Sequence, residues 1–194
     1  MKLVANYFDQ DAFTVPGVFS ADECAALIER AEAIGFEAAS VRTRSGQKMM
    51  TSIRNNDRVN VNDPELAKLM WTRISSILPK LDDQDAVGVD CRLRFYRYEP
   101  GQEFKRHKDG SVTNDEGDVS KLSYLVYLND GFEGGSTTFR DYVGKGDSRR
   151  KIENVVTPSA GTALLFRHER WHEGAPLAVG VKYVLRTDVF YATL

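Results

Sequence analysis

Residues 121–139 read KLSYLVYLNDGFEGGSTTF, and this stretch contains the pattern that decides the fold. Its first part, Leu122–Leu128, is a short apolar run rich in residues that favour strands. The run ends at the turn sequence Asn129-Asp130-Gly131, and Gly134-Gly135 then precedes a second strand-like run, Ser136–Phe139. The stretch therefore predicts a pair of short strands separated by turns.

Strand-like runs continue on both sides of this stretch. Each is short, is apolar or alternating, and is bounded by Gly, Pro, Asn or Asp; the runs are Cys91–Tyr98, Ile152–Val156, Thr162–Phe166 and Val181–Tyr191. No helical pattern interrupts them. Many short strands without interleaved helices favour an antiparallel sandwich or barrel.

The N-terminal part predicts two helices. The first runs from Ser20, which can form a capping box with Glu23, to a stop at Gly35. The second begins at Asp63 and Pro64 and extends to about residue 78. Its expected apolar face comprises Leu66, Leu69, Met70, Ile74, Ile77 and Leu78.

Between these helices, Arg42–Asn60 is polar and basic without a sustained period, which predicts a loop or a lid. We therefore expect a mainly β fold with flanking α-helices. Residues 1–194 should form a single domain, with helical support over about 1–80 and the β core over about 91–192.

The composition limits the class of protein. Hydrophobic residues make up 42% of the chain and charged residues 28%, with a net charge of −2. This is typical of a soluble globular protein and shows no bias toward nucleic acid or membrane. The longest apolar runs are strand-length, and no signal-peptide core is visible, so we predict a cytoplasmic location. Cys24 and Cys91 lack CxxC spacing and predict no thiolate metal site.

The histidines predict a metal centre, although their spacing alone is a weak signal. His107 and Asp109 are two residues apart, so both side chains lie on one face of an extended segment. A third ligand from a distant strand, either His168 or His172, would complete a set of two imidazoles and one carboxylate. Such a set suits iron(II), but a zinc hydrolase could use the same ligands. Each histidine alone is as readily explained by a structural role.

Three blocks of sequence together resemble the 2-oxoglutarate-dependent prolyl 4-hydroxylase family. The first is LRFYRYEPGQEFKRHKD at 93–109, with an aromatic strand, Tyr-x-x-Gly and HxD. The second is the opening stretch, 121–139. The third is PSAGTALLFRHERWHEGAPLAVGVKYVLRTDVFY at 158–191, with a Pro-x-x-Gly turn, an apolar strand, the distal histidine and a basic residue ten positions on. The resemblance implies a double-stranded β-helix, or jelly roll, as the core.

The resemblance also assigns roles to individual residues. Counting back ten positions from Lys182 selects His172 as the third metal ligand. Lys182 would bind the far carboxylate of 2-oxoglutarate. Arg186 lies on the same strand face as Lys182 and would be a second anchor or a substrate contact, or would pair with Asp188. The positions expected to contact the co-substrate through hydroxyl groups are Tyr98, Tyr127 and Ser123.

The implied activity is that of an Fe(II)- and 2-oxoglutarate-dependent oxygenase. O2 would be consumed, 2-oxoglutarate would be decarboxylated to succinate, and an unactivated C–H bond would be hydroxylated, with ascorbate as an optional reductant. Beyond the metal centre, no catalytic residue is expected. Related halogenases replace the carboxylate ligand, so Asp109 favours hydroxylation. The expected substrates are a prolyl peptide, a free amino acid or another small metabolite.

The basic residues of the predicted lid suggest an anionic substrate. These residues are Arg42, Arg44, Lys48, Arg54 and Arg58. Of these, Arg54 and Arg58 are the candidate substrate-binding residues, together with Trp171, which precedes His172. The alternatives are that the predicted lid is a solvated surface loop and that Trp171 only packs against its neighbours.

Three other functions fit parts of the pattern. A nucleic-acid demethylase of the same superfamily typically carries a pair of arginines on the closing strand and a basic face, and the near-neutral charge opposes it. A non-catalytic metal-binding or interaction module would be expected to lose a ligand or the basic anchor. A zinc hydrolase would have no reason for Lys182.

Overall fold

The large sheet of the computed structural model is built mainly from the predicted strands. The structure describes residues 3–38, 41–43, 46–48 and 53–193. In these residues the strand order is β1 (Asn6–Asp9), β2 (Ala12–Val15), β14 (Ala163–Arg167), β10 (Val119–Tyr127), β17 (Lys182–Tyr191), β8 (Arg92–Tyr98), β6 (Asp57–Asn62) and β3 (Glu37–Ala38), and β7 (Ala86–Val89) also pairs with β17.

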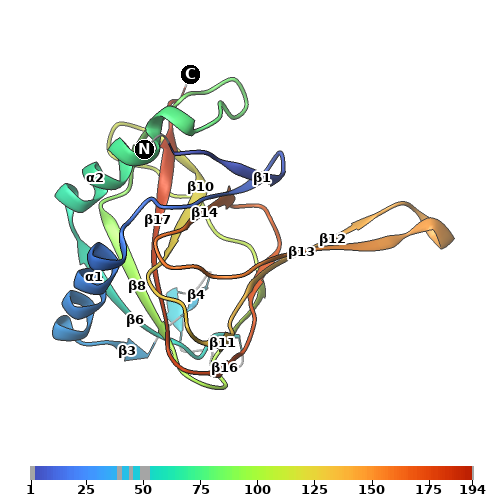
Figure 1. Ribbon diagram of the computed structural model, residues 1–194. Coiled ribbons are helices and arrows are strands. Elements are labelled where there is room, and N and C mark those ends of the chain that lie inside the picture. Colours follow the sequence, from blue (N-terminus) through green and yellow to red (C-terminus); the bar gives the residue numbers. More distant parts are fainter. Residues whose placement is uncertain (1–2, 39–40, 44–45, 49–52, 194) are drawn as a thin grey trace.

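A second sheet carries the histidines. Its order is β13 (Arg150–Val156), β12 (Thr137–Val143), β15 (His172–Gly174) and β9 (Phe104–His107). Two short ladders complete the described strands: β11 (Glu133–Gly134) with β16 (Leu177–Val179), and β4 (Val41–Thr43) with β5 (Gly46–Lys48). All the pairings are antiparallel. The outer part of the β12–β13 hairpin, which carries the 3-10 turn η2 (Gly146–Ser148), projects away from the body (Figure 1).

The two sheets enclose one of two apolar cores, and the arrangement is the predicted jelly roll. This core joins Tyr127 and Phe166 of the large sheet to Phe139 of the small sheet. The other core lies between the large sheet and the helices, where Phe95 and Leu185 are grouped with buried helix residues. The prediction of a mainly β fold with flanking helices is confirmed.

Both predicted helices form, and they lie beside the large sheet (Figure 1). Helix α1 (Ala21–Ile34) has the predicted capping box of Ser20 and Glu23, and it ends at Gly35 with φ 96°. Helix α2 (Pro64–Ile74) is capped by Asp63 and is shorter than predicted, because its last turn continues as the 3-10 helix η1 (Ser75–Ile77). Leu69 does not belong to the buried face, since it is 40% exposed.

The prediction that Arg42–Asn60 is a loop or a lid is wrong where the short strands β4 and β5 pair with each other, and again for its last part. Residues from Asp57 onward form strand β6 and pair with β8. Val59 joins the core under the helices, whereas Arg58 lies opposite Tyr96 on the other face of the sheet. Val59 and Val61 do alternate with polar residues, but this alternation is short and follows directly on a polar, basic stretch, and this is why the strand was missed. Strands β1, β2 and β7 were not predicted either.

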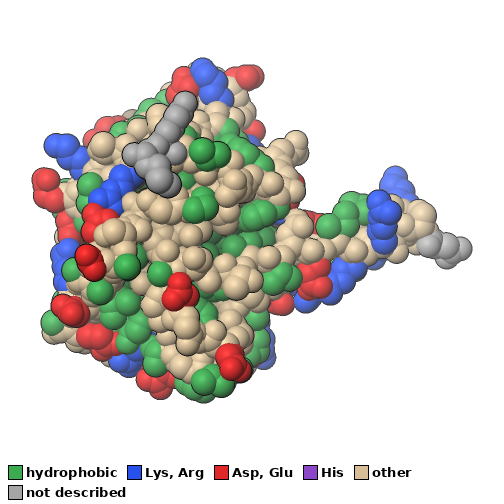
Figure 2. Space-filling model, in the orientation of Figure 1, with side chains coloured by type: hydrophobic (Ala, Val, Ile, Leu, Met, Phe, Trp, Pro, Cys, Tyr) green, Lys and Arg blue, Asp and Glu red, His purple; other side chains and the backbone are tan. Residues whose placement is uncertain are grey.

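The surface agrees with the composition. Figure 2 shows basic and acidic side chains interspersed over the visible face, with no large field of a single sign. None of the helices in the described ranges has the length and apolar character needed to cross a membrane.

Candidate metal centre

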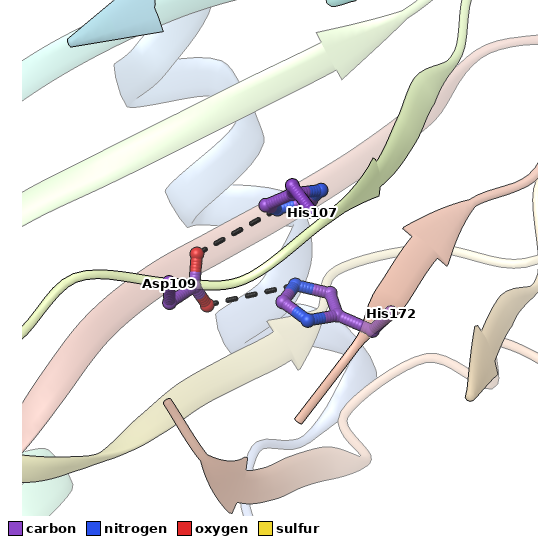
Figure 3. A group of neighbouring side chains, drawn as sticks. All are labelled: His107, Asp109 and His172. Atoms are coloured by element: carbon purple, nitrogen blue, oxygen red, sulfur yellow. Dashed lines mark ion pairs between the residues drawn. The ribbon is translucent and has the colours of Figure 1, made fainter. Parts of the chain in front are cut away.

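His107, Asp109 and His172 lie together where β9 and β15 run side by side. His107 and His172 are direct partners in the antiparallel register, and their ring centroids are 4.2 Å apart. Asp109 follows two residues after His107 and turns its carboxylate between the rings (Figure 3). Each Nε2 lies 3.6 Å from one carboxylate oxygen, and the three ligand atoms lie within 4.8 Å of one another. We call these three residues the metal-ligand group.

Backbone hydrogen bonds orient both imidazoles in the same way. The Nδ1 of His107 lies 2.7 Å from the carbonyl oxygen of Lys105, and the Nδ1 of His172 lies 2.9 Å from that of Arg170. A carbonyl only accepts, so Nδ1 carries the proton and the Nε2 lone pair points toward Asp109. Burial lowers the pKa of His172 to about 4, so this ring is neutral near pH 7, as a metal ligand must be.

The carboxylate of Asp109 is held from behind by Ser123 and Arg186. The Ser123 hydroxyl donates to Oδ2 at 2.5 Å, and Arg186 Nη2 is 3.1 Å from the same oxygen. Burial would raise the pKa of Asp109, but the charge of Arg186, with smaller contributions from the two histidines, keeps it well below its usual value. Asp109 is therefore an anion that is ready to bind a cation.

Arg186 forms ion pairs with two acidic side chains. Besides Asp109, it contacts Asp188 Oδ1 at 3.2 Å. Burial opposes the charge of Arg186, but Asp109 and Asp188 outweigh burial and raise its pKa. Of the roles considered from sequence, ion pairing is the one that the geometry displays, although Arg186 also lines the pocket beside the metal-ligand group.

His168 is placed behind the carboxylate and not among the ligand atoms. Its side chain is 3% exposed, with Nδ1 at 3.0 Å from the Ser123 hydroxyl and Nε2 at 3.0 Å from that of Ser120. The group selected from sequence by the offset from Lys182 is thus the one that the fold brings together.

A pocket, here called the main pocket, opens beside the metal-ligand group. Its walls come from both sheets and are mostly aromatic or apolar. The lining residues are Tyr96, Tyr98, Phe104, His107, Asp109, Leu125, Thr137, His172, Gly174, Lys182, Val184 and Arg186. Such a lining excludes water while leaving a few polar groups to orient a ligand.

Lys182 is the buried cation of the main pocket. It is 3% exposed, its Nζ donates to the carbonyl oxygen of Gly135, and it lies 5.2 Å from the ring centroid of Tyr98. No acidic side chain in the described part of the chain pairs with it, and burial lowers its pKa to about 7. A carboxylate entering the pocket would supply the missing partner.

The predicted hydroxyl contacts fall in different places. Tyr98 lines the main pocket opposite Lys182. The hydroxyl of Tyr127 donates to Thr137 at 2.8 Å, and it is Thr137 that lines the pocket, whereas Ser123 lies behind Asp109. Thr137 was missed from sequence because nothing in the alternation of Ser136–Phe139 marks it as facing a ligand.

The predicted substrate-binding residues lie in different places in the structure. Arg54 is buried against Tyr96 and Phe104, both of which line the pocket. Arg58 lies opposite Tyr96 in the strand register. Trp171 is 41% exposed and stacks with Arg106 and Lys108, so it faces away from the pocket lining. Of the predicted lid, Arg44 and the side chains of Arg42 and Lys48 lie outside the described residues.

Tyr96 is a further pocket residue that sequence reasoning did not single out. Burial would raise the pKa of its phenol, but the nearby charges of Arg54, Arg186 and Arg94 outweigh burial and lower it to about 7. The signal in the sequence was the alternation of Arg94, Tyr96 and Tyr98 on one face of a strand, which standard packing explains equally well.

A jelly roll whose inner face presents two imidazoles and a carboxylate beside a buried cation defines a class of proteins, the non-haem iron oxygenases. A family model described as the 2OG-Fe(II) oxygenase superfamily matches residues 93–187, a range that includes the metal-ligand group and Lys182. This match places the β core of the chain, with the metal-ligand group and Lys182, in the 2OG-dependent oxygenase family. No curated protein sequence matches the chain.

Solved structures of similar fold include three prolyl hydroxylases and also an epimerase, SnoN, in complex with Fe3+, alpha ketoglutarate and nogalamycin RO. A viral collagen prolyl hydroxylase from Paramecium Bursaria Chlorella virus-1, in complex with 2OG, has a TM-score of 0.62 at 18% identity over 95% of this chain and 97% of that one. A prolyl hydroxylase from Trichoplax adhaerens, in complex with a peptide fragment of the oxygen degradation domain of the hypoxia inducible factor, has a TM-score of 0.69 at 16% identity over 93% of this chain and 83% of that one. A Pseudomonas putida prolyl-4-hydroxylase has a TM-score of 0.62 at 22% identity over 94% of this chain and 93% of that one.

Proposed function

We propose that this protein hydroxylates an unactivated C–H bond with Fe(II), O2 and 2-oxoglutarate, and converts 2-oxoglutarate to succinate and CO2. The observation that carries the proposal is the placement of an unpaired, buried Lys182 in the same pocket as the metal-ligand group. The two features match the two ends of 2-oxoglutarate, a chelating 2-oxo acid and a distant carboxylate. When bound, iron and 2-oxoglutarate together activate O2, so that one oxygen atom ends in succinate and the other in the product.

The residues of the chain bind and orient the reactants. His107, Asp109 and His172 would hold the metal through two neutral nitrogen atoms and one carboxylate oxygen, donors that suit iron(II). Lys182 would bind the far carboxylate of 2-oxoglutarate, with Tyr98 and Thr137 beside it. Ser123 and Arg186 hold Asp109 in position. Phe104, Leu125 and Val184 keep bulk water away from the reacting atoms.

A prolyl peptide or a small metabolite is the proposed substrate. Three of the named relatives are prolyl hydroxylases, and one of these is bound to a peptide. Ascorbate is the proposed reductant and the cytoplasm the proposed location. A non-catalytic module is less well supported, because the metal-ligand group and the buried cation are both complete.

The test is succinate release with Fe(II), 2-oxoglutarate, O2 and ascorbate. We expect release by the wild-type chain and by Lys145→Ala, which changes an exposed residue of the projecting hairpin, but none by His172→Ala. Iron binding should be lost with His172→Ala in a direct metal titration. A wild-type chain that binds no iron and releases no succinate would refute the proposal.

A further inference from the structure

One buried cation beside the main pocket has no acidic partner. Arg54 is 5% exposed; its Nε donates to the amide oxygen of Asn56 at 2.6 Å. Its Nη2 is buried and has no hydrogen-bond partner among the described residues. The guanidinium packs on aromatic rings, with Cζ 4.2 Å from the centroid of Tyr96 and 4.5 Å from that of Phe104. Residues 39–52 contain no Asp or Glu, so they offer Arg54 no acidic side chain.

The neighbouring buried acids are already engaged by other arginines. Arg94 pairs with Asp188, and Arg186 pairs with Asp188 and with Asp109. Arg58 adds a further positive charge on the same side, and its pKa is lowered first by burial and then by the charge of Arg54. Among the described residues, these pairings leave Arg54 without a carboxylate of its own beside Tyr96.

Arg54 lies close to the metal-ligand group. Phe104 stacks on His107 with ring centroids 3.5 Å apart and an interplanar angle of 14°. Because the imidazole covers one face of the Phe104 ring, the Arg54 guanidinium takes the other. Lys182 is paired with Tyr98, two residues along β8 from Tyr96, which is roughly 7 Å in a strand. Arg54 does not line the main pocket itself, but it lies behind Tyr96 and Phe104, which do, and it is separate from Lys182.

We propose that Arg54 anchors a carboxylate of the primary substrate, so that this oxygenase acts on a carboxylic acid and not on a neutral molecule. The inference rests on the proposed function. In that function both carboxylates of 2-oxoglutarate are used, one by iron and one by Lys182, so neither is left to pair with Arg54. One unpaired guanidinium matches one negative charge, and arginine pairs well with carboxylates. In a buried site this attraction is weakly screened by salt.

The carboxylate can belong to a free acid or to an acidic peptide. Both present the same group to Arg54, and the wall of Tyr96 and Phe104 would pack against the carbon atoms next to it. The C–H bond that is hydroxylated would then lie a short distance from the carboxylate, since Arg54 and His107 sandwich a single aromatic ring.

Tyr96 gives a readout that does not require the natural substrate. Arg54 is the first of the charges that lower the pKa of this phenol to about 7 against the effect of burial. A bound carboxylate would neutralise Arg54 and raise the pKa of Tyr96. The phenolate absorbs in the near ultraviolet, so this change can be followed directly, and Tyr96→Phe identifies the signal.

The first experiment measures succinate release by the iron-loaded, full-length chain. Matched pairs are added, each a carboxylic acid with its amide: amino acids, short hydroxy acids, and prolyl peptides with Glu or Gln. We expect stimulation by the acids alone, and about ten- to hundredfold weaker stimulation in Arg54→Gln but not in Arg149→Gln, an exposed control in the projecting hairpin. Stimulation by free acids would identify a free acid as the substrate, and stimulation by the Glu peptides would identify an acidic peptide. Amides that stimulate as well as acids would overturn the inference. A wild-type chain that binds no iron and releases no succinate with any addition would refute the proposed function instead.

The second experiment uses benzoate and benzamide as probes, with iron and saturating 2-oxoglutarate and without O2. Benzoate should raise the pKa of Tyr96 in the wild type and not in Arg54→Met, and benzamide should leave it unchanged. Because Arg54→Met removes an unpaired buried charge and keeps an apolar side chain, its melting temperature should be at or above that of the wild type. A folded wild type whose Tyr96 ignores benzoate, or an Arg54→Met chain that unfolds earlier, would assign Arg54 a structural role.

Discussion

The two histidines of the metal-ligand group owe their orientation to backbone carbonyl groups that precede them closely in the chain. In each case Nδ1 is hydrogen-bonded to the carbonyl two residues earlier, and Nε2 faces the carboxylate of Asp109. The carboxylate in turn depends on Ser123 and Arg186. At this scale, each functional side chain can be tested through the neighbour that holds it.

Replacing Lys182 with alanine tests the co-substrate anchor. We expect the KM for 2-oxoglutarate to rise by about ten- to hundredfold, because a buried charge-assisted hydrogen bond is lost. Iron affinity should stay near the wild-type value, since Lys182 does not touch the metal-ligand group. Lys145→Ala is the matched control. An equal loss of iron affinity in Lys182→Ala would contradict the assigned role.

The KM for 2-oxoglutarate should also depend on pH. Burial lowers the pKa of Lys182 to about 7 in the free protein, so the lysine is charged below that pH and neutral above it. Binding a carboxylate requires the charged form, so the KM should rise by up to about tenfold per pH unit above 7. Arg in place of Lys182 keeps its charge and should give a flat profile. A wild-type KM that falls between pH 7 and 9 would refute this.

Ser123→Ala tests the support of Asp109. The substitution removes the hydroxyl that donates to Oδ2, and iron affinity should fall by about ten- to hundredfold. Ser148→Ala, at the exposed end of the projecting hairpin, is the control. The KM for 2-oxoglutarate at saturating iron should change little. Unchanged iron affinity in Ser123→Ala would mean that Arg186 alone holds the carboxylate.

At the scale of elements, strands place the site and helices stabilise it. The antiparallel register of β9 and β15 sets His107 opposite His172, and that of β17 and β8 sets Lys182 opposite Tyr98. Helix α2 contributes nothing to the main pocket and buries its apolar face in the other core. The two layers can therefore be perturbed separately.

Met70→Ala tests this separation. Met70 is fully buried on α2, and its truncation should lower the free energy of unfolding by about 2–5 kcal/mol. Denaturant unfolding measures the loss. Below the new transition, the KM for 2-oxoglutarate and the iron affinity should match those of the wild type. A selective change in iron affinity would show that the helix layer also shapes the site.

At the scale of the whole molecule, the jelly roll joins parts of the chain that are far apart in sequence. Residues 107 and 109 meet residue 172, and residue 182 returns to the same pocket from the closing strand. Between the two sheets, Arg94, Arg186, Asp109 and Asp188 form a balanced ionic group, beside which Arg54 is unbalanced. The organisation of residues 1–194 as one domain stays a prediction.

Local chemistry made several features readable from the sequence itself. The capping box at Ser20 and the stop at Gly35 act within a few residues, so helix α1 was predicted almost to its ends. Strands β8, β10, β12, β13, β14 and β17 were visible because each carries its own apolar run or alternation between turns, whereas the short strands β9, β11, β15 and β16 were not predicted. The HxD pair and the ten-residue offset from His172 to Lys182 can also be read from the order of the residues. Through the resemblance to a known family, they selected the residues that the fold brings together.

Other features exist only after folding. Nothing near Arg186 in sequence marks Asp109 as its partner, and nothing near Thr137 marks it as a pocket residue beside Tyr127. Strand β6 was missed because its two apolar residues, Val59 and Val61, stand among polar ones. The missing acidic partner of Arg54 depends on which carboxylates other strands bring to its side and which arginines already occupy them. The sequence by itself thus determined most of the longer elements, because those signals are local, and it supplied the candidate ligand residues through the resemblance of three blocks to a known family. The tertiary structure decided the charge balance of the pocket, because pairing is set by distances in space.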